Sequence, residues 1–350
     1  INMFFNDLIF FIILIVYSYI QNRFLLYVFS KNKLTFLLDN NFLKPQAFHE
    51  YPTNRIGGFA VFFPIFLTFF YLYYFKNTFY FEFISFCSFF FILGILDDLK
   101  IDIRPKLRLI IMVLLLAFLV IKNQFYIEKT GFMFLNNLLT IDIFSLFFVC
   151  LCFLFIVNGS NLIDGFNGLL GIHSFIILLI LSLINFTDET NDLSFILLCV
   201  SASILVFIKF NFPKARMFLG DSGAYLIGTF ISVSTITTSI LNPIISPFFF
   251  CILLFYLFFE VFFSFFRKIF IAKQNPLFPD DQHLHMRVYK FLLKKNYTKE
   301  KANYSTAIYI NLIYLLLISP SVFLLENFLF CKYYFIFLLL VYIYLYKKIK

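Results

Sequence analysis

The chain has 350 residues, of which 62% are hydrophobic and only 13% are charged, and its net charge is +9. This composition excludes a soluble globular protein and is typical of an integral membrane protein. The positive charge does not by itself indicate a nucleic acid partner, because basic residues beside a membrane attract anionic lipids. The six Cys residues lie in or beside apolar runs without a CxxC pair, so they are expected to be packing residues.

Long apolar runs separated by polar breaks predict an all-α polytopic membrane protein with about eleven transmembrane helices, in a single domain over 1–350. The expected spans are 4–20, 57–75, 79–96, 107–121, 144–157, 169–185, 194–209, 222–241, 246–266, 304–325 and 328–346. Several are shorter than the roughly 20 residues that cross a bilayer, so they are expected to extend into their flanks. The first run is not followed by a small-residue cleavage site and is expected to be retained as a span.

The basic residues favour one orientation of these spans. With the N-terminus outside and the C-terminus inside, all but four of the 28 Lys and Arg residues fall on the inside. The outside keeps Lys76, Lys122, Lys129 and Lys332. Lys and Arg concentrate in cytoplasmic loops, so the sequence predicts an N-out, C-in protein.

Polar and glycine-rich clusters interrupt the apolar pattern at five places, all on the predicted inside. They are 52–58, 97–106, 158–168, 218–223 and 279–287. Each has a simpler interpretation when taken alone, since 97–98 can end a helix, 220–223 can cap one, and 283–285 can be a surface loop. Glu260, near an apolar run, can anchor a basic residue such as Arg267. Together, the five clusters predict a composite site in a cytosolic-facing cleft, with 267–303 as a partly helical cap.

The residue types in these clusters point to phosphate chemistry. Carboxylate and amide oxygens suit Mg²⁺, which usually binds one or two protein oxygens together with substrate phosphates. Asn161 and Asp221 can supply such oxygens, and Asp97 and Asp98 can be further ligands or can orient an acceptor. The side chains that can neutralise phosphates are Arg55, Lys106, His283, His285 and Arg287. Carboxylates, a divalent cation and basic groups are the components of phosphoryl transfer, and no GxxxxGK[ST] loop is present.

Five motifs follow one another along the chain. They are His49-Glu-Tyr-Pro52-Thr53-Asn54-Arg55-Ile-Gly57-Gly58, Gly94-Ile-Leu-Asp97-Asp98, the segment from Asn158 to Leu169, Phe218-Leu-Gly220-Asp221-Ser-Gly223, and Pro279-Asp280-Asp-Gln-His283-Leu-His285. In this order they resemble HxxPTPRxGG, GxxDD, NxxNxxDGxDGL, FxGDxGS and PDxxHLHH. These are the motifs of the polyprenyl-phosphate N-acetylhexosamine-1-phosphate transferases, the family of MraY- and WecA-like membrane enzymes.

The resemblance implies a reaction and a set of roles. A UDP-sugar would donate sugar-1-phosphate to polyprenyl (undecaprenyl) phosphate, with release of UMP. Asn161 and Asp221 would bind Mg²⁺, with Mn²⁺ as an alternative, and Asp97 and Asp98 would lie at the acceptor phosphate. The expected phosphate-binding residues are Lys106, His283, His285 and Arg287, and the other expected substrate-binding residues are Arg55, Asn158, Asp164, Asn167 and Gly220. The expected location is the bacterial inner membrane, and a homodimer is left open.

Three positions depart from the family motifs. Asn54 stands where the family has Pro, Asn167 where it has the second Asp of DGxDG, and Met286 where it has a third His. These departures favour a subgroup most similar to the O-antigen or capsule initiators, and they leave the donor sugar open.

Two other functional classes remain as alternatives. A transporter or lipid flippase would place its charges near the middle of the bilayer in broken helices, often with an internal repeat. Here the acids lie at span ends on one side, and no repeat is found. A non-catalytic scaffold for glycan assembly would not need Asp97, Asp98, Asp164 and Asp221 together.

Overall fold

The computed structural model describes residues 2–31, 37–39, 52–101, 104–187, 190–275 and 280–349. The motif residues His49 and Pro279 lie outside these ranges. The first half of the chain forms α1 (Asn2–Lys31), β1 (Leu38–Asp39), β2 (Thr53–Asn54), α2 (Gly57–Tyr71), the π-helix η1 (Leu72–Lys76), α3 (Phe81–Asp98), α4 (Pro105–Asn123), α5 (Met133–Leu139) and α6 (Asp142–Ile163). The second half forms α7 (Leu169–Ile184), α8 (Asn191–Asn211), α9 (Gly220–Leu241), α10 (Pro247–Leu253), α11 (Phe255–Phe266), η2 (Arg267–Ile271), α12 (Leu284–Lys294), α13 (Lys299–Phe323) and α14 (Phe328–Lys348).

The helical, polytopic architecture is confirmed, whereas the count of eleven spans is not. Within the described residues, seven helices are long and apolar enough to cross a membrane, or up to eight if the bent pair α10 and α11 with η2 is one span. The other expected spans do form helices, but α7 has only 16 residues, and α3 and α4 each carry three charged residues. The single-domain organisation and the N-out, C-in orientation remain predictions.

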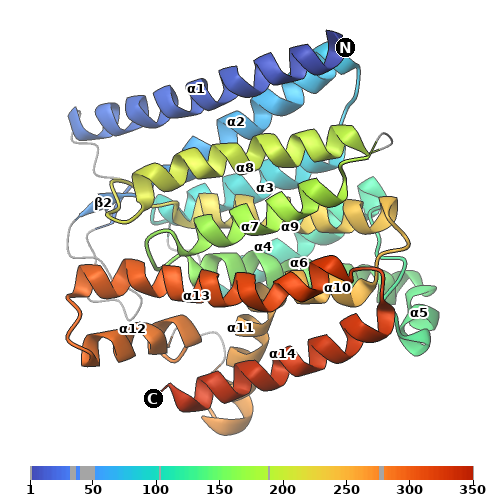
Figure 1. The fold of residues 1–350 in the computed structure, drawn as a ribbon, viewed down its shortest axis with the longest axis vertical. Coiled ribbons are helices and arrows are strands. Elements are labelled where there is room, and N and C mark those ends of the chain that lie inside the picture. The colour runs from blue at the N-terminus through green and yellow to red at the C-terminus, as the bar shows by residue number, and fades with distance from the viewer. Residues whose placement is uncertain are drawn as a thin grey trace.

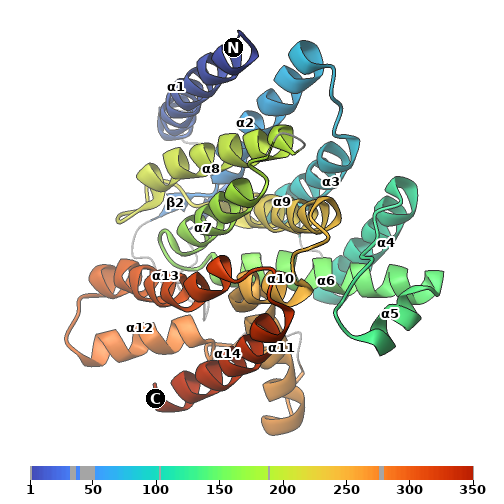
Figure 2. The same ribbon diagram turned by 45° about the vertical axis from the view of Figure 1, so that its right-hand side comes forward.

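Helix α9 lies at the centre of the molecule and packs against α2, α3, α6 and α7 (Figures 1 and 2). Its sequence is rich in Gly, Ser and Thr, and small residues let neighbouring membrane helices approach closely. A Cβ atom at Gly228 would lie 2.8 Å from the Cα atom of Val157 on α6. This close packing brings the N-terminus of α9 against the ends of α3 and α6.

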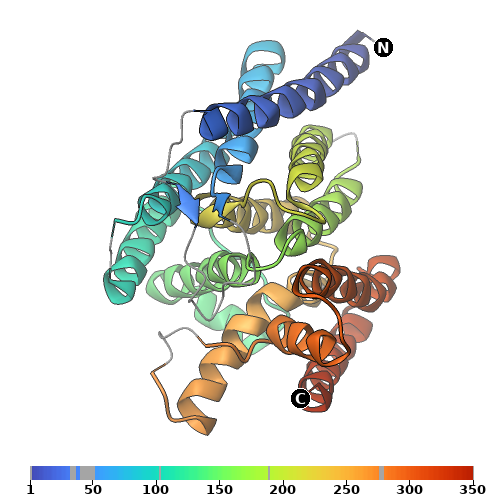
Figure 3. The same ribbon diagram turned by 90° about the vertical axis from the view of Figure 1, so that its left-hand side faces the viewer.

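The polar clusters gather at one end of the bundle. Helices α3 and α6 finish there, and α2, α4, α7 and α9 begin there, on the side of β2, whereas α12 lies further away, beside α13 (Figure 1). Figure 3 turns this end towards the viewer and shows the short strands beside the start of α9. The two chain termini lie at opposite ends of the helices. The expected meeting of the motifs on one face is therefore present in the fold.

The bend between α10 and α11 directs α11 towards α12. The two helices are inclined by 77° at the break. A break inside a membrane leaves carbonyl groups that need partners. The hydroxyl of Tyr314 on α13 donates to the carbonyl of Leu253 at 2.5 Å, which satisfies one of them.

Candidate active site

The N-terminus of α9 is held by a carboxylate from α3. The backbone N–H groups of Asp221 and Ser222 donate to the two oxygens of Asp98, each at 2.9 Å. Asp98 is only 2% exposed, and Gly220 has φ +77°, so that a Cβ atom there would lie 2.7 Å from Asp98 Oδ2. A carboxylate at a helix N-terminus contributes roughly 0.3–1 kcal/mol, and about 2 kcal/mol when partly buried. Asp98 therefore joins α3 to α9 and shapes the turn that carries Asp221.

Arg55 lies among the carboxylates at this turn. Its Nη1 atom is 3.5 Å from Asp98 Oδ1 and 4.0 Å from Asp221 Oδ2, while its Nε and Nη2 atoms donate to Asp39 Oδ2 at 3.1 and 2.6 Å. Burial alone would lower the pKa of Arg55, but the charges of Asp221, Asp39 and Asp98 raise it overall. Arg55 is positioned by main-chain bonds that join 53–58 to the segment before α9.

Asn161 and Asp164 approach the same turn from the end of α6. The Asn161 amide donates to Asp221 Oδ1 at 2.7 Å, and the side chain of Asp221 is 27% exposed. Asp164 accepts the backbone N–H of Gly220. Removal from water, followed by the charges of Asp221 and Asp98, raises the pKa of Asp164 well above its ordinary value, although Arg55 opposes this. We call Asp98, Asp164 and Asp221 the aspartate centre.

Asp97 lies beside the aspartate centre with its own partners. It accepts hydrogen bonds from Arg108 Nη1 and from the hydroxyl of Tyr225, both at 3.1 Å. Lys106, the expected basic residue of this region, is exposed at the start of α4. Arg108 and Tyr225 were not predicted as partners of Asp97, although Tyr225 lies one helical turn after Asp221 and therefore on the same face of α9.

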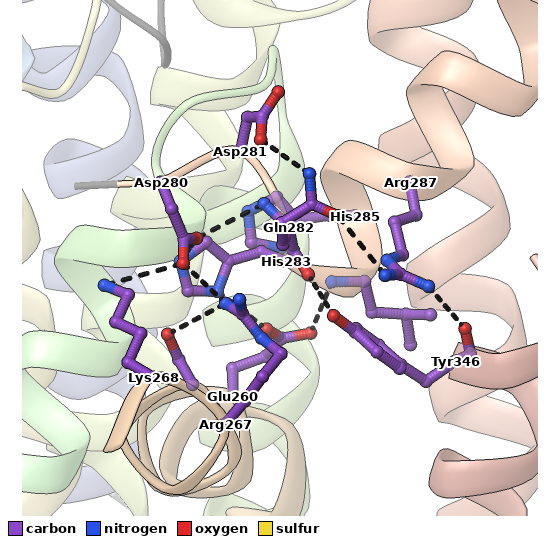
Figure 4. A network of polar contacts seen from close by, with 12 residues as sticks. Glu260, Arg267, Lys268, Asp280, Asp281, Gln282, His283, His285, Arg287 and Tyr346 are labelled. Atoms are coloured by element: carbon purple, nitrogen blue, oxygen red, sulfur yellow. Dashed lines mark hydrogen bonds and ion pairs between the residues drawn. The ribbon is translucent and has the colours of Figure 1, made fainter. Parts of the chain in front are cut away.

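The histidine motif forms a second cluster around a buried carboxylate (Figure 4). His283 Nδ1 lies 3.1 Å from Glu260 Oε2, and His283 Nε2 lies 3.4 Å from Asp280 Oδ1. Asp280 also pairs with Arg267 at 2.6 Å and with Lys268 at 3.7 Å. Burial opposes the charge on Asp280, but Arg267, His283 and Lys268 lower its pKa overall. The interpretation that Glu260 anchors Arg267 is wrong, because Arg267 pairs with Asp280.

His285 and Arg287 are engaged within the protein. The ring of His285 is fully buried, and its Nδ1 atom forms a hydrogen bond with the Tyr256 hydroxyl at 3.1 Å. Its Nε2 atom has no partner among the described residues. Burial, partly opposed by Glu260, lowers the pKa of His285 to about 3, so its ring is neutral. Arg287 donates to the carbonyl of Tyr346 at 2.9 Å and lies 3.8 Å from the centre of its ring. Arg287 therefore joins α12 to the end of α14.

The segment 164–168 connects the two clusters. Asp164 belongs to the aspartate centre, whereas Phe166 packs against His285 with ring centres 5.6 Å apart. Asn167 donates through its amide to the carbonyl of Pro213 at 2.9 Å, and its backbone N–H donates to Asn303. Asn158, one of the expected substrate-binding residues, donates to the carbonyl of Leu154 within α6.

The expected cleft over these clusters remains a prediction. A hollow of about 260 Å³ lies at the other end of the bundle, near α5. Its lining includes Glu128, Asn136 and Asp142, and none of the expected site residues.

The aspartate centre fits a divalent cation that shares its ligands with a substrate. Within the described ranges, no three His, Cys, Asp or Glu side chains are placed to hold a metal ion by themselves. Asp221 and Asn161 are nevertheless in direct contact through the amide nitrogen of Asn161. The contact places a carboxylate beside a carboxamide, and both groups carry oxygens of the kind that hard cations bind. Mg²⁺ commonly uses one or two such protein ligands and completes its shell with phosphates and water.

Comparisons with known proteins agree with this assembly. Residues 80–239 match the model of glycosyl transferase family 4. The undecaprenyl-phosphate alpha-N-acetylglucosaminyl 1-phosphate transferase of Thermotoga maritima is 28% identical over 203 residues, which cover 56% of this chain and 57% of that protein. The enzyme of the same name from Escherichia coli (strain K12) is 25% identical, over 60% of this chain and 57% of its own length. The phospho-N-acetylmuramoyl-pentapeptide-transferase of Dictyoglomus turgidum is 31% identical, over 44% of this chain and 50% of that protein.

The matched region contains three of the five motifs, including all the residues of the aspartate centre. The chain spans less than two thirds of the length of each of these relatives. Over residues 80–239, the order of the motifs, the helical fold and the matches agree that the chain is similar to glycosyl transferase family 4.

Proposed function

We propose that the chain transfers N-acetylhexosamine-1-phosphate from a UDP-sugar to polyprenyl phosphate in the bacterial inner membrane. An oxygen of the acceptor phosphate would bond to the phosphorus that carries the sugar. The bond from that phosphorus to the bridging oxygen would break, and UMP would leave with this oxygen. The product would be a polyprenyl-diphosphate sugar that starts a surface glycan such as O-antigen or capsule. Two relatives named for undecaprenyl phosphate and N-acetylglucosaminyl 1-phosphate support this acceptor and donor class.

The aspartate centre is the observation that carries this proposal. Three carboxylates meet at the N-terminus of α9, and Arg55 is the one cation within 4.0 Å of Asp98 or Asp221 among the described residues. Such an excess of negative charge suits a divalent cation bound to a diphosphate. Asp221 and Asn161 would hold Mg²⁺, or Mn²⁺ in its place. When bound, the ion would neutralise charge on the diphosphate.

The remaining roles follow from the surroundings of each residue. Asp98 would keep the 220–222 turn and Arg55 in place, and Asp97, held by Arg108, would lie near the acceptor phosphate. Asp164 and Asn167 would lie near the nucleotide and the sugar. Lys106, His283, His285 and Arg287 would bind phosphates directly or position the groups that do. The second pKa of a phosphate monoester is about 6, so the acceptor is mostly dianionic near neutral pH and its placement matters more than a general base.

The test is release of UMP by the purified full chain with undecaprenyl phosphate and a panel of UDP-sugars, with and without Mg²⁺. We expect metal-dependent release from UDP-N-acetylglucosamine or another UDP-N-acetylhexosamine. If folded protein releases no UMP from any donor, the proposal is wrong. If UMP is released equally well without a divalent cation, the proposed transfer reaction stands but the proposed metal site is wrong.

A further inference from the structure

The carboxylate of Glu260 is buried beside the start of α12 and accepts three hydrogen bonds. Glu260 lies on α11 and is only 1% exposed. Its Oε2 atom is 3.1 Å from His283 Nδ1, and its Oε1 atom accepts from the backbone N–H of Leu284 at 3.2 Å and from the Tyr342 hydroxyl at 2.9 Å. A buried carboxylate is costly unless it is paired and hydrogen-bonded. Here the donors come from the start of α12 and from α14, so one carboxylate joins three helices.

These contacts fix the orientation of the His283 ring. Because Nδ1 faces Glu260, Nε2 is directed to the opposite side, where it meets Asp280 Oδ1 at 3.4 Å (Figure 4). A histidine can donate from both ring nitrogens only as the imidazolium. The hydrogen bond made by one nitrogen sets the state and the direction of the other. Glu260 therefore fixes the direction of the ring and points Nε2 to the side of Asp280.

An anion already occupies that side of the ring. The carboxylate of Asp280 is held by Arg267 and Lys268, and its Oδ1 atom also accepts the backbone N–H of Gln282 at 3.2 Å. The surroundings of His283 Nε2 thus suit a negatively charged oxygen. A phosphate oxygen has the same charge and the same hydrogen-bonding capacity as the carboxylate oxygen found there.

We propose that Glu260 is a positioning residue for His283, through which it acts on phosphate transfer. This inference rests on the proposed function. Glu260 would not contact the substrate; it would hold Nδ1, keep the Nε2 atom of His283 aimed at an anionic oxygen, and fix the first turn of α12. Carboxylates that orient metal-ligating histidines contribute roughly 10–100-fold to metal affinity or activity, and we expect an effect of this size for the carboxylate that orients His283.

The variant Glu260→Gln tests this role, because it keeps the size of the side chain and removes its charge. We expect kcat to fall by roughly 10–100-fold while the KM for the UDP-sugar changes less than about threefold. In the His283→Ala background the same substitution should cost little more, because a residue that acts through His283 cannot act without it. The matched control is Tyr314→Phe, which removes a buried hydrogen bond to α10 without touching His283 and should keep its activity.

Independent, multiplicative losses for Glu260→Gln and His283→Ala would overturn the proposal, as would a Glu260→Gln enzyme within about threefold of the wild type. If the Gln variant does not fold, the same cycle is made with Glu260→Asp, which keeps the charge and should be intermediate. Hydrogen exchange over 283–290 reports the contact without activity. Faster exchange in Glu260→Gln is expected because the uncharged amide oxygen of Gln is a weaker acceptor for the Leu284 N–H than the carboxylate, and unchanged exchange contradicts the positioning. Absence of UMP release by the wild type would instead reject the proposed function.

Discussion

Two charged clusters at opposite ends of the bundle differ in how their charges are paired. At the end near the N-terminus, Lys76 Nζ lies 2.8 Å from both Asp7 and Asp192, and its side chain is only 4% exposed. The Tyr71 hydroxyl adds a hydrogen bond to Asp7 at 2.8 Å. In the aspartate centre, Arg55 makes its short contacts with Asp39 and lies 3.5 and 4.0 Å from Asp98 and Asp221.

The difference distinguishes a cluster with a structural role from the cluster proposed as the active site. The Lys76 cluster satisfies its charges by direct contact and joins α1, η1 and α8. The aspartate centre keeps several carboxylates together with incomplete compensation, at the cost of a raised pKa at Asp164. Uncompensated charge near a membrane face is expensive and is retained where a ligand completes it. Substitutions in the two clusters should therefore have opposite effects on activity and stability.

The largest effect on activity is expected for Asp221→Asn. The substitution removes the negative charge of the proposed metal ligand and leaves a side chain of nearly equal size. UMP release should fall at least about 100-fold, because metal stabilisation of the diphosphate is worth several kcal/mol. The melting temperature in detergent should stay the same or rise. Retained turnover in this variant would argue strongly against the metal role.

Lys76→Met should have the opposite effect. Removing one partner of a buried ion pair leaves carboxylates without compensation and typically costs about 3 kcal/mol or more. We expect a lower melting temperature and a loss of contact between α1 and the rest of the bundle, measured by proteolysis of α1. The kcat of the protein that remains folded at low temperature should be unchanged. A loss of kcat without a loss of stability would remove the distinction between the two clusters.

Asp164→Asn should change how stability depends on pH. Because the pKa of Asp164 is raised in the folded protein, the folded state binds more protons than the unfolded state above the ordinary Asp value of about 4. Ionisation of Asp164 therefore lowers the free energy of unfolding as pH rises from about 4 towards the raised pKa of this group. Without divalent cations, the Asn variant should melt higher than the wild type at pH 7–8, with the difference shrinking towards pH 4. Parallel melting curves over this range would show that Asp164 carries no such charge penalty.

A smaller effect is expected for Asp39→Asn, which weakens the two hydrogen bonds that orient Arg55. Because Arg55 keeps its other partners, we expect the KM for the UDP-sugar to rise only about three- to tenfold, with kcat little changed. Steady-state kinetics with the donor as the varied substrate measure this directly. A change in kcat alone would mean that Arg55 acts on the reacting groups and not on donor binding.

The sequence predicted the helices and their meeting place better than the contacts within the site. The distribution of Lys and Arg and the order of the spans were enough to predict that the five clusters meet at one end, because each span reverses the direction of the chain. The role of Asp98 as a cap for α9 could not be predicted, since its partners are more than 120 residues away in sequence. Asp39 follows no motif and reaches Arg55 only through the β1–β2 pairing. Glu260 was predicted to anchor a basic residue such as Arg267. Its partner in the structure is His283, and this pairing depends on the bend between α10 and α11.

Binding of Mn²⁺ tests the proposed metal site most directly. It is measured by electron paramagnetic resonance with the wild type and with Asp221→Asn, each with and without UDP-N-acetylglucosamine. If the aspartate centre holds a cation together with a diphosphate, Mn²⁺ should bind weakly to the wild type alone and much more tightly with the nucleotide sugar. The Asn variant should lose the tight binding. Equal binding by the two proteins, or wild-type binding that ignores the nucleotide sugar, would contradict the central claim that this surplus of carboxylates serves a metal-bound diphosphate.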